Sequence, residues 1–143
     1  EPDKSFVQAA TMASSNEITA SDFARDKSFN TDVENYAKKM LSDHRIMAVK
    51  LKAAVPLSAR APTGNVDQKV VDALKDKQGE AFNAAYIKIV ALDGHKQAIA
   101  VFEKEAKEGK NSDLREFATA QLPELREHYK LAQALAKKNG IAE

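Results

Sequence analysis

The chain has 143 residues, of which 43% are hydrophobic and 30% charged, so it fits one globular domain spanning residues 1–143. Twenty-two lysines and arginines against 21 aspartates and glutamates give a net charge of +1 without a long basic block, which argues against nucleic acid as a partner. The absence of cysteine excludes disulfides and thiolate chemistry, and no apolar run approaches the length of a transmembrane helix.

The first part of the chain predicts two long helices. Apolar residues spaced by four and three favour a helix over about 3–25. Thr31, followed three residues later by Glu34, matches a capping box, so a second helix is expected from Thr31 to about Val55, where Pro56 stops it. The inward positions predicted for these helices are Phe6, Ala10, Ala13, Glu17, Ala20 and Ala24, and then Val33, Ala37, Met40, His44, Met47 and Leu51.

A long connection follows the second helix. The segment from Pro56 to Gly64 has two of the four prolines and little periodicity, which is typical of a loop. Asn65 is expected to cap a short helix that passes through Leu74 and ends near Gly79. The short helix therefore lies in the crossover between the second and third long helices.

Two more long helices are predicted in the second half. The third runs from about Glu80 to Glu108, and Asn111 or Ser112 caps a fourth that ends at Gly140. Their inward positions are Ala81, Ala85, Leu92, His95, Ile99 and Phe102, interrupted by Lys88, and then Leu114, Ala118, Gln121, Leu125, His128, Ala132 and Leu135. Pro123 lies inside the fourth helix, where the missing N–H is expected to produce a kink.

These elements define the expected architecture. Ala, Lys, Glu and Leu are among the commonest residues, while only five glycines occur, and no strand pattern competes with the helical periodicity. Four long helices with two tight hairpins and one long crossover predict an all-α protein, an antiparallel four-helix bundle with a short extra helix.

Each long helix carries one ionisable residue on its inward stripe: Glu17, His44, His95 and His128. Counting 1.5 Å per residue from the two turns places His44 about 6 Å from the level of Glu17, and His128 about 4–5 Å from the level of His95. All four are therefore expected near the middle of the bundle, within about one helical turn. Asp43, next to His44, could reach the same layer.

Two interpretations of this layer are open. Neutral imidazoles and a carboxylate that converge would suit a divalent metal such as zinc, iron(II) or manganese. The candidate ligands are Glu17, His44, His95 and His128, with Asp43 as a further candidate. Alternatively, the same groups form a hydrogen-bonded polar layer in a structural or interaction protein without metal.

The sequence lacks the metal-binding motif of di-iron helical bundles. Their Glu-x-x-His motif places two ligands on one face, one turn apart. In this chain the residues three before the histidines are Leu41, Leu92 and Leu125. There is also no glycine-rich phosphate loop and no His-Glu-x-x-His motif, so no catalytic residue is predicted and a non-enzymatic protein is expected.

Two segments carry a resemblance to a known family: "YAKKMLSDHRIMAVKLKAA" and "GEAFNAAYIKIVALDGHKQAIAVFEKEAKEGKNSDLREFATAQLPELREHYKLA". The chain resembles, over nearly its whole length, an exported bacterial ferritin-like family carried as a domain of unknown function. The specific marks are Met40, Asp43-His44, Phe82, Tyr86, His95, Leu122-Pro123 and His128. Asn83 stands where the family usually has aspartate.

The resemblance implies a ferritin-like bundle, a cleaved signal peptide and a location in the periplasm or cell envelope. The start at Glu1-Pro2, without an initiator methionine, agrees with such processing. A monomer or a weak homo-oligomer is expected. The resemblance supplies no activity.

Overall fold

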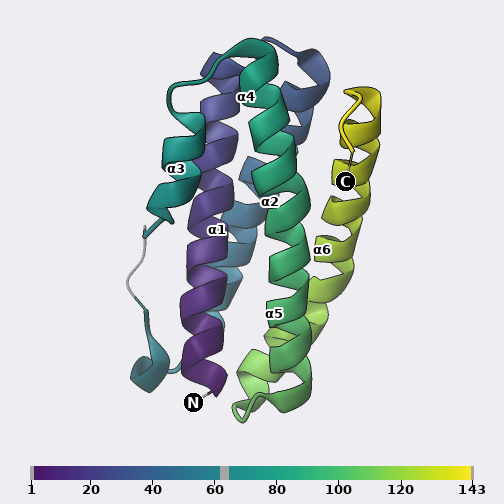
Figure 1. Ribbon diagram of the computed structural model, residues 1–143. Coiled ribbons are helices and arrows are strands. Elements are labelled where there is room, and N and C mark those ends of the chain that lie inside the picture. Colours follow the sequence, from purple (N-terminus) through teal and green to yellow (C-terminus); the bar gives the residue numbers. More distant parts are fainter. Residues whose placement is uncertain (1, 62–64, 143) are drawn as a thin grey trace.

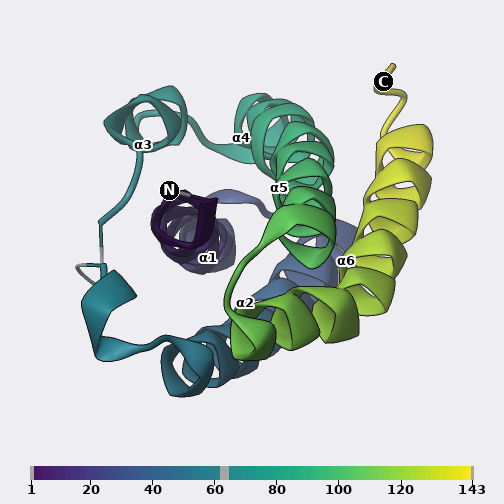
Figure 2. The same ribbon diagram turned by 90° about the horizontal axis from the view of Figure 1, so that it is seen from below.

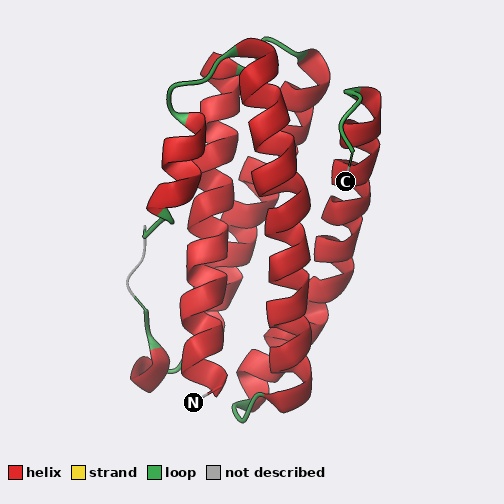
Figure 3. Ribbon diagram, viewed as in Figure 1, coloured by secondary structure: helices red, strands yellow, loops and turns green. Residues whose placement is uncertain are grey.

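The computed structural model describes residues 2–61 and 65–142, and this part of the chain is helical without strands (Figure 3). The predicted loop residues 62–64 lie outside the described residues. The elements are α1 (Pro2–Lys27), α2 (Thr31–Ala54), η1 (Leu57–Ala59), α3 (Gln68–Leu74), α4 (Gly79–Ala85), η2 (Tyr86–Gly94), α5 (His95–Glu108) and α6 (Ser112–Lys138). None of the described helices combines the length and apolarity that crossing a membrane requires.

The long helices form a bundle around one interior. α1 packs on α2 and α5, and α6 packs on α2 and α5. Figure 1 shows that α1 and α6 run in one direction and that α2 and α5 run in the other, so each packed pair is antiparallel. The crossover returns along the bundle, and α3 lies beside α1 (Figures 1 and 2). A helical bundle with an extra helix between α2 and α4 is therefore confirmed.

Side-chain caps fix where three helices begin. The Asn111 side chain accepts from the Leu114 N–H, which confirms Asn111 as the cap of α6. Two predicted caps are wrong. Asn30, not Thr31, caps α2 by accepting from the Val33 N–H, and Asp67, not Asn65, caps α3. In both cases an acceptor one or two residues away occupies the extended backbone position that a cap requires.

The third long helix is continuous from α4 through α5, but its middle, η2, is a π-helix of nine residues. The i→i+5 bonding of a π-helix adds residues to each turn and shifts the phase of the inward stripe. Phe82, Tyr86 and Ala91 are consequently buried before His95, while the predicted inward Ala81 is exposed. Lys88 does not interrupt the stripe, because in the observed phase it faces outward.

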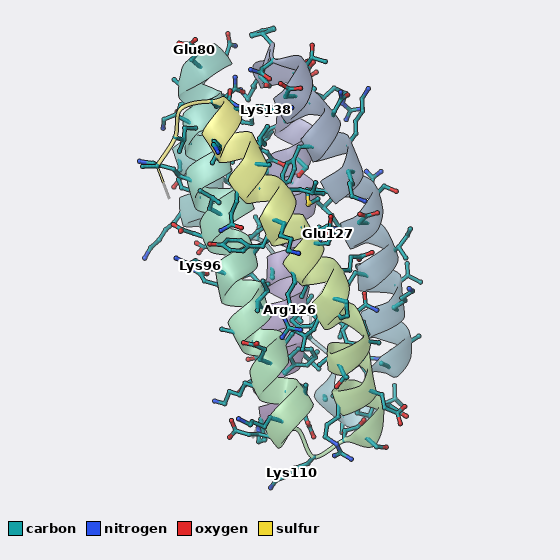
Figure 4. All side chains as sticks on the ribbon, turned by 90° about the vertical axis from the view of Figure 1, so that its right-hand side faces the viewer. Glu80, Lys96, Lys110, Arg126, Glu127 and Lys138 are labelled. Atoms are coloured by element: carbon teal, nitrogen blue, oxygen red, sulfur yellow. The ribbon has the colours of Figure 1, made fainter. Side chains whose placement is uncertain are left out.

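α6 changes direction part-way along its length when seen along the bundle (Figure 2), in agreement with the expected effect of Pro123 inside it. Its outer face carries charged residues such as Arg126 and Glu127 (Figure 4). The predicted inward positions of α2 and α6 are all buried. The periodicity therefore predicts the inner faces of these two helices correctly.

The buried apolar side chains form two clusters, one toward each end of the bundle. The first includes Met40, Ala91 and Ala132, and the second includes Met47, Ala98 and Leu125. On each of α2, α5 and α6 a histidine lies between the residues of the two clusters. The three histidines thus form a polar layer that lies between the two apolar clusters.

The connection after α2 is the expected site of first cleavage by trypsin, after Arg60. Arg60 is exposed and Leu57 is 78% exposed, and only the short turn η1 orders the backbone there. In contrast, the Lys27 ammonium donates to the Lys75 carbonyl, and the Lys110 N–H donates to the buried Asp3 carboxylate. Mass spectrometry of a limited digest checks this order, and first cleavage after Lys27 or Lys110 would contradict it.

Candidate metal centre

Three imidazoles meet at the level between the two apolar clusters. His44 of α2, His95 at the start of α5 and His128 of α6 are all buried. Their ring centroids lie 5.4, 5.1 and 5.3 Å apart for the pairs 44–95, 44–128 and 95–128, an almost equilateral triangle. One nitrogen from each ring lies within 4.8 Å of the other two. The predicted convergence of the three histidines is confirmed.

Hydrogen bonds assign the tautomer of His95. Its Nδ1 lies 2.9 Å from the Ala91 carbonyl oxygen, which can only accept, so Nδ1 carries the proton and donates. The Nε2 of the neutral ring therefore has a lone pair, which can accept from His44 Nε2 at 3.3 Å. A ligand histidine that donates its other N–H to a backbone carbonyl is the usual arrangement at metal sites.

His128 is oriented from the opposite side by a carboxylate. Its Nε2 donates to Asp43 Oδ2 at 2.9 Å, and Lys39 Nζ lies 3.0 Å from the same oxygen. This bond leaves Nδ1 as the ring nitrogen of His128 that is free to join the cluster. Asp43, predicted as a possible ligand, thus contacts the layer through His128.

Two ring nitrogens in the cluster are buried without a hydrogen-bond partner among the described residues: His44 Nδ1 and His128 Nδ1. Buried polar atoms are usually paired, so His128 Nδ1, which the bond to Asp43 leaves free, calls for a ligand. The 3.3 Å between the Nε2 atoms of His44 and His95 also fits a metal. Two imidazoles bound at 2.0–2.1 Å to a tetrahedral ion have their nitrogens about 3.3 Å apart.

Burial keeps His44 and His95 neutral. It lowers the pKa of His44 well below its usual value, and the neighbouring His95 and His128 lower it further. Burial also lowers the pKa of His95 to about 4, against the hydrogen bond to Ala91, which raises it. These two imidazoles therefore have the unprotonated form that metal binding requires at neutral pH.

The carboxylates near the layer are in different states. Burial raises the pKa of Glu17 well above its usual value, so this side chain favours the protonated form. Burial also raises the pKa of Asp43, but hydrogen bonds from Lys39 and His128 outweigh it and hold that pKa below its usual value. Asp43 is thus the anionic partner of the cluster, and Glu17 is neutral at mildly acidic pH.

Glu17 lies beside the histidine cluster rather than inside it. It lines a cleft of about 470 Å³ between α1, η2 and α5, together with His44 and His95. It belongs to neither of the two groups of potential ligands found among the described residues, which are His44, His95 and His128, and Asp43, Glu124 and His128. The predicted four-residue layer is therefore a three-histidine cluster with a neighbouring carboxyl group.

Sequence reasoning misses the groups that hold the cluster in place. The Ala91 carbonyl is available to His95 within η2, and no side-chain signal could reveal it. The Tyr36 hydroxyl lies 3.5 Å from His95 Nδ1, whereas Tyr86 pairs with Ser21 at 2.7 Å, away from the histidines. Asp43 is predicted from its position next to His44, although its partner is His128.

Fold and site together define an all-helical protein with a buried three-histidine cluster that could hold a metal ion. Residues 1–135 match the family model described as "Domain of unknown function (DUF4142)", and the chain belongs to this family. Neither the comparison with curated proteins nor that with solved structures gave a match.

Proposed function

We propose that this protein binds one divalent transition metal ion through His44, His95 and His128. The observation that carries the proposal is the triangle of buried imidazoles, each able to supply a nitrogen within 4.8 Å of the other two. The unpartnered Nδ1 of His128 and the lowered pKa values of His44 and His95 support it. The ion, when bound, would supply a Lewis acid in the middle of the bundle.

The donor set favours some metals over others. Three neutral imidazoles suit zinc and iron(II), whereas manganese prefers oxygen ligands. Asp43 accepts from His128 Nε2 and so fixes the tautomer and orientation of that ring. We therefore propose zinc or iron(II) ahead of manganese.

Metal analysis of protein purified without a chelator or a histidine tag tests the proposal. One equivalent of metal per chain is expected, and His44→Ala, His95→Ala and His128→Ala should each lose it. Gln121→Ala is the matched control, because Gln121 is also a buried polar residue of α6 but lies outside the histidine cluster. Metal-free wild-type protein that takes up none of the three metals would refute the proposal.

Asp43→Asn should weaken metal binding by about 10–100-fold, the usual effect of losing the partner that orients a ligand histidine. The amide keeps an acceptor for His128 but loses the charge. Isothermal titration with zinc checks the affinity. Lys39→Gln is the control, because it removes the other partner of Asp43 and leaves the bond to His128 in place. Equal affinities in Asp43→Asn and wild type would remove Asp43 from the proposal.

A structural role without metal is the alternative. The hydrogen bonds from His95 to Ala91 and from His128 to Asp43 already satisfy part of the layer. In that case the histidines would set the level at which the helices pack, and the chain would serve as an interaction protein. The metal analysis separates the two functions.

We further propose a ferritin-like arrangement and export to the periplasm or cell envelope. The antiparallel pairs α1–α2 and α5–α6, joined by a long crossover, support the first. The family resemblance carried by the sequence supports the second. Cell fractionation of the full gene product tests the location, and recovery in the cytoplasmic fraction would contradict it.

A further inference from the structure

The cleft beside the cluster reaches two of its three histidines. Of the three, His44 and His95 line it and His128 does not, because the His128 ring bonds to Asp43 on the other side of the layer. The cleft is also lined by Glu17, by Ala13 one turn earlier in α1, and by Gly94. An ion held by the three imidazoles would therefore meet the cleft along the direction that no histidine occupies.

Glu17 lines the cleft together with His44 and His95. Its Oε1 atom is buried and has no hydrogen-bond partner among the described residues. Its Oε2 atom lies close to Gly94, so that a Cβ added to this glycine would stand 3.6 Å from it, and Gly94 directly precedes His95. A buried carboxyl oxygen without a partner is costly unless a ligand satisfies it.

We propose that the three-histidine site keeps an open fourth position, which faces this cleft, and that Glu17 hydrogen-bonds the exchangeable ligand there. The ligand class is water or a small monoanion. Three histidines with an open position are the arrangement of zinc sites that exchange ligands, whereas purely structural zinc sites have four protein ligands. This inference rests on the proposed function, since it needs a metal at the cluster.

Cobalt(II) with azide as the added ligand tests the open position. Cobalt(II) replaces zinc in tetrahedral sites and has visible absorption bands that respond to its ligands. In the wild type, azide should change the spectrum in a saturable way with one azide per cobalt. Ala13→Leu, which fills the cleft, should weaken azide binding by about tenfold or more and leave cobalt affinity unchanged. Ala48→Leu, in the separate groove between α1 and α2, is the matched control.

The role of Glu17 is tested in the same assay. Glu17→Ala should weaken azide binding by about tenfold, the usual effect of losing a hydrogen bond to a charged group. Glu17→Gln keeps a donor and an acceptor and should stay within about threefold of the wild type. If both substitutions abolish cobalt binding instead, Glu17 is a ligand and the position is not open.

The possible failures are distinguishable. Bound cobalt whose spectrum does not respond to azide would overturn the open position and leave the metal site standing. An equal azide response in Ala13→Leu and wild type would overturn the assignment of the cleft as the route. If the protein binds neither cobalt nor zinc, iron(II) or manganese, the metal site itself is refuted, and this inference with it.

Discussion

Zinc at a hundredfold excess over its Kd is expected to stabilise the wild-type protein by about 2.7 kcal/mol at pH 7.5. The reason is that the site exists only in the folded state, where His44, His95 and His128 lie within reach of one ion. For a domain of this size the melting temperature should rise by about 5–10 °C. Differential scanning calorimetry of metal-free protein with and without zinc checks the shift.

The histidine variants separate metal binding from simple packing. Each of His44→Ala, His95→Ala and His128→Ala should abolish the shift. They should also destabilise the metal-free protein, because His128→Ala, for example, removes one of the two partners of the partly buried Asp43. Loss of stability alone is therefore not diagnostic. Gln121→Ala should lower the melting temperature and retain the zinc response, and a wild type that responds to no metal would leave the histidines as a polar layer.

Much of the fold can be predicted because helical periodicity reports burial directly. Each apolar residue of the α2 and α6 stripes is buried, and so are the histidines that interrupt them. The level of the three histidines follows from the rise per residue and the two short turns. Caps are less predictable, since Asn30 and Thr31 are both good cap residues and only the backbone geometry selects between them.

Other features of the fold and the site leave no periodic pattern in the sequence and could not be predicted from it. The π-helix η2 shifts the inward face by part of a turn, so periodicity misplaces Ala81 on the third long helix. The position of Glu17 beside the cluster, and not between the histidines, depends on the packing of α1 against η2 and α5. The tautomer of His95 depends on a backbone carbonyl. Sequence thus locates the polar layer, and three-dimensional packing determines its chemistry.

The metal-free protein is expected to lose stability as the pH falls from about 6.5 to 4.5. The folded-state pKa of His95, about 4, lies below its unfolded value of 6.5, and that of His44 is also lowered. In this window the unfolded chain binds protons at both residues and the folded chain does not, so acid favours unfolding. Glu17 acts in the opposite direction, because its raised pKa keeps a proton on the folded protein that the unfolded chain releases.

The two histidines lower the free energy of unfolding as the pH falls, and the one carboxyl group raises it. The free energy of unfolding should therefore fall by about 1 kcal/mol for each pH unit across the window. Glu17→Gln removes the opposing contribution, because the amide does not titrate. In this variant the free energy of unfolding should therefore change with pH about twice as steeply as in the wild type. Other acidic groups contribute equally to both proteins. Urea unfolding at pH 6.5, 5.5 and 4.5 measures both slopes. Parallel curves would mean that Glu17 is ionised in the folded protein, and a flat wild-type curve would contradict the burial of two neutral imidazoles at the centre of the bundle.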